Sequence, residues 1–258
     1  METAKAWEYY DEIAEMYDEY YALDMRARLY ESLMAFLLTE SLQKFGPWKL
    51  GIEVGGGTGK WTKAIIEKVE KLIFVEPSSR MLSIAKSRNR DIDGIEYVEA
   101  TLENFQVPQD VEVVFLIGDI LSYVDDVKVT MEKISARIRR GGHIIGSVDS
   151  YYHALREIVR AGDGSARRYL ERYRSMRVGN DELSDVSFVT RCFDTRELSM
   201  LFKTHGFEII DLAGIMVFGP YDERIVNFDE VLKAEKEYAR NPDLINIAEH
   251  IFFVAVRR

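Results

Sequence analysis

The first forty-five residues place apolar side chains at the three- and four-residue spacing of amphipathic helices. The pattern predicts one helix over residues 3–22, with acidic side chains on its other face, and a second over residues 25–44 that ends at Gly46-Pro47. Six of the fourteen tyrosines lie among the first thirty residues. These helices therefore either pack as core against a sheet or form a lid whose phenols reach a ligand.

From residue 49 onward, short apolar runs alternate with amphipathic helices, which predicts an α/β fold with a doubly wound, mostly parallel sheet of seven strands. Such sheets bind ligands at the carboxyl ends of their strands. Ser78 is expected to cap the helix after the second strand, and Asp125 a later helix that extends through Ile138 to Gly141. The helix after the first strand is expected to reach Val69. The predicted strands are 50–54, 72–75, 95–98, 111–117, 143–148, 207–212 and 251–256.

Residues 151–177 interrupt this alternation. They have a helical pattern and hold seven arginines against three acidic residues. The arginines either hold an anionic substrate or form the solvated face of an inserted helix, and the second is the commoner arrangement. A short strand is expected over 186–193. We divide the chain into an N-terminal helical lid (1–46), a ligand-binding core (47–150), a helical insertion that caps the substrate (151–190) and the remainder of the α/β core (191–258).

Charge and composition narrow the classes of partner. The net charge of -10 argues against broad binding to nucleic acid or to an anionic membrane surface, and no apolar run is long enough to span a bilayer. The single cysteine, Cys192, offers neither an internal disulfide nor a cysteine metal site, which suits a reducing cytoplasm. The sequence leaves open whether the chain forms a homodimer.

A glycine-rich junction over residues 50–59 carries the clearest chemical signal. A phosphate-binding loop is excluded because Val54 stands where its first glycine belongs, and a dinucleotide fingerprint fits poorly because Lys60 replaces its third glycine. The motif that remains is E-x-G-x-G-x-G, from Glu53 to Gly59. Glu76 ends the second strand and either accepts hydrogen bonds from two ribose hydroxyls or is a solvated residue before a proline turn.

This motif resembles the first motif of class I S-adenosylmethionine-dependent methyltransferases. The span 49–150 is similar to the core of their small-molecule type, near the ubiquinone/menaquinone-biosynthesis group. The resemblance implies S-adenosylmethionine as cofactor and S-adenosylhomocysteine as product. It also implies transfer of a methyl group to O, N or C of an unidentified small-molecule acceptor.

The resemblance also assigns cofactor-binding residues. Glu53 would orient the methionine part, three glycines of the loop would wrap the cofactor, and Glu76 would bind the ribose. Residues 100–105 match the third motif of the family, with Thr101 where many members have an aspartate. The implied cofactor-binding residues are Tyr17, Glu53, Gly55, Gly57, Gly59, Glu76, Pro77, Met81, Thr101, Leu102, Ile117 and Gly118.

On the substrate side, we expect Tyr21, Asp119, Tyr123 and Tyr151 to contribute, with residues 151–177 as a wall. Asp119 is not followed by the Pro-Pro-aromatic sequence with which relatives that methylate amides or bases grip a planar amino group. In the family the last strand runs antiparallel, which would bring His250 near Asp119. His250 is then either a general base or, more commonly for such a residue, a hydrogen-bonded structural histidine. No metal cluster is expected.

Three rival functions remain from the sequence. The chain could be a methyltransferase for RNA or protein that uses the arginine-rich insertion for docking, or a cofactor-binding module without transfer activity. A nicotinamide dehydrogenase is least favoured because of Lys60.

Overall fold

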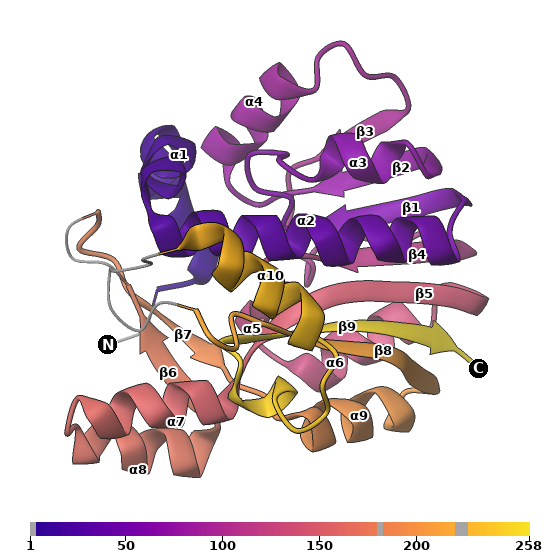
Figure 1. Cartoon of the computed structure of the whole chain (residues 1–258). Coiled ribbons are helices and arrows are strands. Elements are labelled where there is room, and N and C mark those ends of the chain that lie inside the picture. The colour runs from indigo at the N-terminus through magenta and orange to yellow at the C-terminus, as the bar shows by residue number, and fades with distance from the viewer. Residues whose placement is uncertain (1–3, 180–182, 220–226) are drawn as a thin grey trace.

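A seven-stranded sheet forms the centre of the computed structural model, which describes residues 4–179, 183–219 and 227–258. The strand order is β3-β2-β1-β4-β5-β9-β8, and β9 runs antiparallel to both of its neighbours (Figure 1). The predicted doubly wound, mostly parallel sheet is therefore confirmed. The strands are β1 (Trp48–Val54), β2 (Val69–Val75), β3 (Ile95–Val98), β4 (Val111–Leu116), β5 (Ile138–Asp149), β8 (Phe207–Ile215) and β9 (His250–Arg257).

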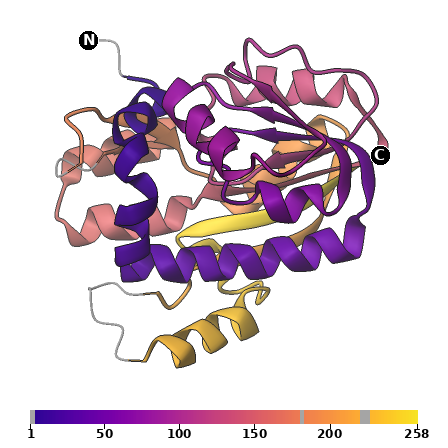
Figure 2. The same cartoon turned by 90° about the horizontal axis from the view of Figure 1, so that it is seen from above.

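Helices cover both faces of the sheet, so that three layers result (Figure 2). One face packs against α2 (Met25–Phe45), α3 (Thr62–Ile66), α4 (Ser79–Arg88) and α10 (Phe228–Tyr238). The other packs against α5 (Ile120–Tyr123), α6 (Val127–Ser135) and α9 (Thr195–Thr204). The central strand β4 is buried along its whole length, as a strand covered on both faces requires.

Two strands begin earlier than the sequence pattern predicts. Val69, expected at the end of a helix, starts β2 and pairs with Trp48 of β1. Ile138, also expected in a helix, starts β5 and pairs with Val111 of β4, and residues 139–141 continue the strand. Both predictions were wrong for one reason. A single apolar residue beside charged ones fits a helix face or a strand end equally well. Pairing with a neighbouring strand, which the local sequence does not show, makes both residues part of a strand.

Helix caps are partly as predicted. The Ser78 hydroxyl oxygen accepts from the Met81 N–H at 3.0 Å and begins α4. The cap of α6 is Asp126, whose carboxylate accepts from two N–H groups of the first turn. The predicted cap, Asp125, instead pairs with Lys5 at 2.5 Å. The short helix α5 was not predicted.

The insertion holds two helices and a hairpin. These are α7 (Tyr151–Arg160), α8 (Gly164–Tyr173), β6 (Ser175–Val178) and β7 (Phe188–Arg191). The expected helix over 151–177 is wrong beyond Tyr173, because Arg174 adopts a left-handed conformation with φ of 57° and ends α8. A 3-10 helix, Ile245–Ile247, precedes β9. Within the described ranges, no helix is both long and apolar enough to cross a membrane.

Helix α1 (Ala6–Leu23) lies across the edge of the sheet where the parallel strands end (Figure 1). It contacts α2, α4 and β7. Asp24 alone separates α1 from α2 and accepts from the N–H groups of Arg26 and Ala27, which caps α2. The predicted N-terminal helices are thus present, and α1 is placed to cover a site at this edge.

Two positions on α9 test the importance of the packed face. Phe202 is fully buried and its ring lies 4.9 Å from that of Phe253 of β9, whereas Met200 is 61% exposed. We expect Phe202→Ala to lower the free energy of unfolding by about 3–5 kcal/mol because it leaves a cavity. Met200→Ala should change it by less than about 0.5 kcal/mol. Urea denaturation measures both, and equal effects would contradict the described packing.

Candidate functional site

A cavity of about 500 Å³ lies where β1, β2 and β4 end, and residues of α1 form one of its walls. Its volume is in the range of small-molecule sites, roughly 300–1,000 Å³. Thirteen of the residues predicted from the sequence line it. They are Tyr17, Tyr21, Glu53, Gly55, Gly57, Glu76, Pro77, Met81, Thr101, Leu102, Ile117, Gly118 and Tyr123.

Four predicted residues lie outside this lining: Gly59, Asp119, Tyr151 and His250. Gly59 faces α4, where a Cβ would lie 2.5 Å from the Asn89 amide nitrogen, so this glycine allows the loop to pack on the helix. The guanidinium carbon of Arg174 lies over the Tyr151 ring, 3.5 Å from the ring centre. None of the residues that the structure describes within 151–190 lines the cavity.

The glycines of the site differ in what they face. Gly57 and Gly118 have φ angles of +56° and +84°, and a Cβ on either would meet nothing within 4 Å. Both therefore turn bare backbone toward open space in the cavity, where a ligand can approach the main chain. Gly55 also has positive φ, but its Cβ would lie 2.3 Å from the Ile120 side chain. Gly55 thus permits close packing against α5.

The Glu76 carboxylate lies beside the glycine loop. One oxygen accepts from the Gly57 N–H and the other from the Ser78 N–H, each at 2.9 Å. Burial raises the pKa of Glu76 to about 7, although these two backbone donors oppose the shift. The carboxylate therefore holds the loops after β1 and β2 together and also faces the cavity.

Glu53, at the end of β1, has one oxygen satisfied and one not. The Thr62 hydroxyl donates to Oε2 at 2.8 Å, while Oε1 is buried and has no hydrogen-bond partner. Burial raises the pKa of Glu53 to about 8. Because buried polar atoms are nearly always hydrogen-bonded, the free oxygen at the cavity wall indicates a position for a ligand donor.

Two carboxylates of α1 hold the helix over the site. Asp11 accepts from the Ser78 hydroxyl at 2.6 Å and lies near Arg80, and Asp18 accepts from the Thr58 hydroxyl at 3.1 Å. These contacts were not predicted from the sequence, because all acidic side chains of this helix were expected on its solvent face. Their seven-residue spacing, which places both on one side of the helix, was the available signal.

Tyrosines form much of the wall contributed by the helices. Tyr10 and Tyr30 line the cavity in addition to the predicted tyrosines, and the Tyr10 and Tyr123 hydroxyl oxygens lie 3.5 Å apart. Burial raises the pKa values of Tyr10, Tyr17, Tyr30 and Tyr123 well above the ordinary value. These phenols are therefore neutral near pH 7 and act as hydrogen-bonding, partly apolar walls.

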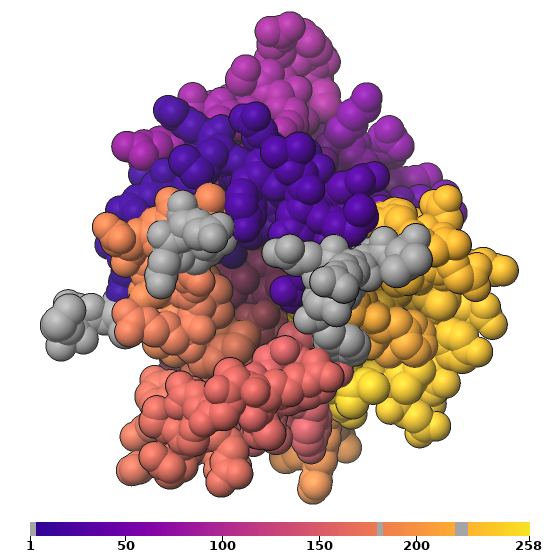
Figure 3. Space-filling view, turned by 60° about the vertical axis from the view of Figure 1, so that its left-hand side comes forward, coloured from indigo at the N-terminus to yellow at the C-terminus, as the bar shows by residue number. Residues whose placement is uncertain are grey.

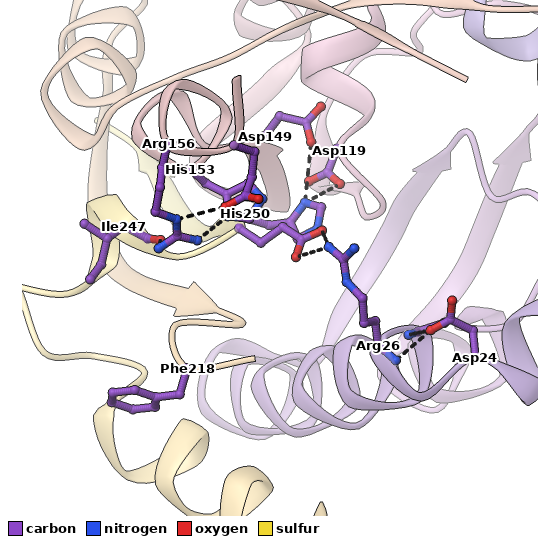
Figure 4. Close-up of polar contacts among 12 residues, drawn as sticks. Asp24, Arg26, Asp119, Asp149, His153, Arg156, Phe218, Ile247 and His250 are labelled. Carbon is purple, nitrogen blue, oxygen red and sulfur yellow. Dashed lines mark hydrogen bonds and ion pairs between the residues drawn. The ribbon is translucent and has the colours of Figure 1, made fainter. Parts of the chain in front are cut away.

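A second polar cluster lies next to the cavity (Figure 4). The Nδ1 atom of His250 is 2.9 Å from Asp119 Oδ2 and 3.6 Å from Asp149 Oδ1, and the Tyr30 ring packs on the imidazole. The antiparallel direction of β9 produces the proximity of His250 and Asp119 that the sequence predicted. Burial opposes charge on His250, but the carboxylates of Asp119 and Glu249 raise its pKa well above the ordinary value. A histidine that keeps its proton in this way is a poor general base.

The molecular surface is hollowed between the N-terminal helices, the β6–β7 hairpin and α7 (Figure 3). Arg26 of α2, which makes two 2.8 Å hydrogen bonds to the Glu249 carboxylate, and His153 of α7 come from elements that border this hollow (Figure 4). The cluster around His250 thus lies between the helices that cover the carboxyl edge of the sheet.

Comparisons with known proteins agree with this geometry. Residues 52–142 match the family model described as a methyltransferase domain. An uncharacterized protein of Methanocaldococcus jannaschii is 30% identical over 141 residues, which are 54% of this chain and 61% of that protein. The chain thus spans about three fifths of the length of the curated relative that it matches.

Solved structures share the fold. An S-adenosylmethionine-dependent methyltransferase of Mesorhizobium loti gives a TM-score of 0.60 at 17% identity over 85% of this chain and 96% of the other. DhpI, solved in a complex with SAM, gives 0.58 at 14% identity over 94% and 97%. Residues 52–142 therefore match a methyltransferase domain, and the chain shares the fold of solved S-adenosylmethionine-dependent methyltransferases, as the sequence predicts. The ubiquinone/menaquinone subgroup stays a prediction.

The raised pKa of Glu53 predicts a pH dependence of stability in the ligand-free protein. The folded state keeps until about pH 8 a proton that the unfolded chain releases near pH 4.5. The free energy of unfolding should therefore fall as pH rises from 5 to 8, by at most about 1.4 kcal/mol per pH unit from this residue. Urea denaturation at three pH values measures the slope. Glu53→Gln should reduce the slope to the part that other buried acids such as Glu76 contribute, whereas Glu208→Gln, an exposed change on β8, should keep the full slope. Equal slopes in the unaltered protein and both variants would contradict the prediction.

Proposed function

We propose that this protein binds S-adenosylmethionine in the cavity and transfers its methyl group to a small-molecule acceptor. The observation that carries the proposal is the pairing of bare backbone at Gly57 with two inward-facing carboxylates, Glu53 and Glu76. DhpI, with the same fold, is solved with SAM and with SAH. The methyltransferase domain match supports the same chemistry.

The nucleoside end of the cofactor fits the side of the cavity near Glu76. Glu76 lies at the end of β2, where a carboxylate accepts hydrogen bonds from ribose hydroxyls. Pro77 and the buried Met81 line the cavity on one side of this carboxylate, and Thr101 and Leu102 line it too. These side chains offer apolar surface to the adenine, and the backbone at Leu102 offers polar groups to its edge.

The amino-acid end fits the side near Glu53. An ammonium group is a strong donor, and it would satisfy the buried Glu53 oxygen that has no partner within the protein. Gly57 and Gly118 leave room at this end for a ligand to contact the main chain. Tyr17 of α1 would then cover the bound cofactor, in agreement with its position in the cavity wall.

The cofactor supplies a methyl group on a positively charged sulfur, so the protein has to align the acceptor and exclude water. Helix α1 contributes to both through Tyr10, Tyr17 and Tyr21, and Tyr123 of α5 lies with Tyr21 on the acceptor side. Helix α1 thus acts as the lid, whereas α2, which the sequence also assigned to the lid, packs on the sheet. The insertion supports the lid indirectly, because Phe188 of β7 packs against Tyr9 and Tyr10 of α1.

A titration with S-adenosylhomocysteine tests the cofactor site. We expect Glu76→Ala to weaken binding about ten- to hundredfold, since hydrogen bonds to a charged group contribute roughly 1.5–3 kcal/mol. Calorimetry measures the dissociation constants. The matched control is Glu112→Ala, which also removes a buried carboxylate that accepts a backbone N–H, from Lys49, at the far end of β4. Equal losses in both variants would contradict the assigned role of Glu76.

Methyl transfer itself is tested with cofactor labelled in the methyl group and a panel of small hydroxyl, amine and carbon-acid acceptors. Label should move to at least one acceptor class. Gly57→Val fills the open space beside the loop and also strains a backbone with φ of +56°, so it should abolish transfer and cofactor binding together; circular dichroism checks that the variant is folded. Tight cofactor binding without transfer to any member of the panel would instead identify a binding module.

A further inference from the structure

Three potential metal ligands meet at one edge of the sheet, beside the cavity. Asp119 follows β4, Asp149 ends β5 and His250 begins the antiparallel strand β9. Asp149 and His250 are direct partners in the β5–β9 register, so their side chains share one face of the sheet. Figure 4 shows both carboxylates directed toward the imidazole. Three strands therefore bring a nitrogen and two carboxylates together.

The spacing suits a bound cation. One ligand atom from each residue lies within 4.8 Å of the other two, and the separations from Nδ1 are 2.9 Å to Asp119 and 3.6 Å to Asp149. Ligand atoms held about 2.1 Å from a metal lie roughly 3.0–3.4 Å from one another in octahedral or tetrahedral arrangements. The two distances from Nδ1 are close to this range, and the two carboxylate oxygens, at most 4.8 Å apart, would move closer around a bound cation.

The cluster also leaves a polar atom unsatisfied. Asp119 is 3% exposed, and its Oδ1 atom has no hydrogen-bond partner. The other oxygen, Oδ2, lies 2.9 Å from His250 Nδ1 and forms an ion pair with it. Leaving a buried carboxylate oxygen unpaired is costly, and a cation that displaces the imidazolium proton to solvent would bind Nδ1 and offer Asp119 a positive partner in its place.

Surrounding groups hold the three side chains in place. The Thr190 hydroxyl donates to Asp149 Oδ2 at 2.5 Å, which leaves Oδ1 facing His250. The second ring nitrogen of His250 lies 3.7 Å from the Glu249 carboxylate, which Arg26 holds in turn. A carboxylate behind the distal nitrogen of a ligating histidine is a recurring feature of metal sites, since it fixes the orientation of the ring.

We propose that Asp119, Asp149 and His250 form a binding site for a divalent transition-metal cation of the manganese-to-zinc series. The imidazole favours these ions over magnesium and calcium, which prefer oxygen ligands. Three protein ligands would leave coordination positions open, and Tyr30 and Gly118, which neighbour the cluster, line the cavity. The site is independent of the proposed methyl transfer and its test requires no turnover.

Metal binding is tested on tag-free full-length protein after dialysis against a chelator. Titration with Co²⁺ should saturate at one ion per chain and produce visible absorption bands of a coordinated ion, and calorimetry with Mn²⁺ and Zn²⁺ should show the same stoichiometry. We expect His250→Gln and Asp149→Asn to weaken binding at least about tenfold, and Thr190→Val to weaken it about tenfold through the orientation of Asp149. Asp211→Asn, a partly buried carboxylate change on β8, should bind like the unaltered chain.

S-adenosylhomocysteine titration of each variant serves as the folding control and separates this proposal from the previous one. Retained S-adenosylhomocysteine binding with lost Co²⁺ binding supports the metal site. If one of the three variants His250→Gln, Asp149→Asn and Thr190→Val does not fold, the Co²⁺ affinities of the other two test the metal site. Absence of saturable Co²⁺ binding in the unaltered chain, or unchanged affinity in the folded variants, would show that His250 and Asp119 form an ion pair only and would overturn the proposal.

Discussion

The carboxylate of Glu76 is the interaction on which the site depends. Its two oxygens bind the N–H groups of Gly57 and Ser78, so one side chain fixes both the loop after β1 and the loop after β2. Burial makes this carboxylate hard to ionise, as it does Glu53. Buried acids of this kind lower the stability of the empty protein near neutral pH, a cost that proteins commonly accept at binding sites.

Much of the fold follows from local signals in the sequence. Apolar runs of strand length separated by amphipathic helices predict the sheet, and Ser78 marks a true helix start. The errors lie where two outcomes are locally equivalent. Asp125 and Asp126 are adjacent and chemically identical, and only the contact of Asp125 with Lys5 separates their roles. Arg174 gives no local sign that it ends α8.

The sequence predicted most of the residues that line the cavity, but not the direction in which several of them face. The spacing of Glu53, the glycines and Glu76 predicts which loops meet, because parallel strands end at one edge. It does not show that Gly57 faces open space while Gly59 of the same motif packs against Asn89. Nor does it show that Asp11 and Asp18 turn inward to the glycine loop and α4. These orientations depend on residues distant in sequence.

The single-residue joint at Asp24 has a mechanical consequence. Helix α1 walls the cavity, yet its attachments to the glycine loop and α4 include the half-exposed ion pairs of Asp11 with Arg80 and Asp18 with Arg88. Such pairs contribute only about 0.2–1 kcal/mol each and weaken with salt. Outward movement of α1 about Asp24 would leave the sheet intact, but it would have to break these pairs and the buried contact of Tyr9 with Phe188. Of these contacts only the ion pairs are screened by salt, so higher ionic strength would favour the outward position of α1 by a small free energy.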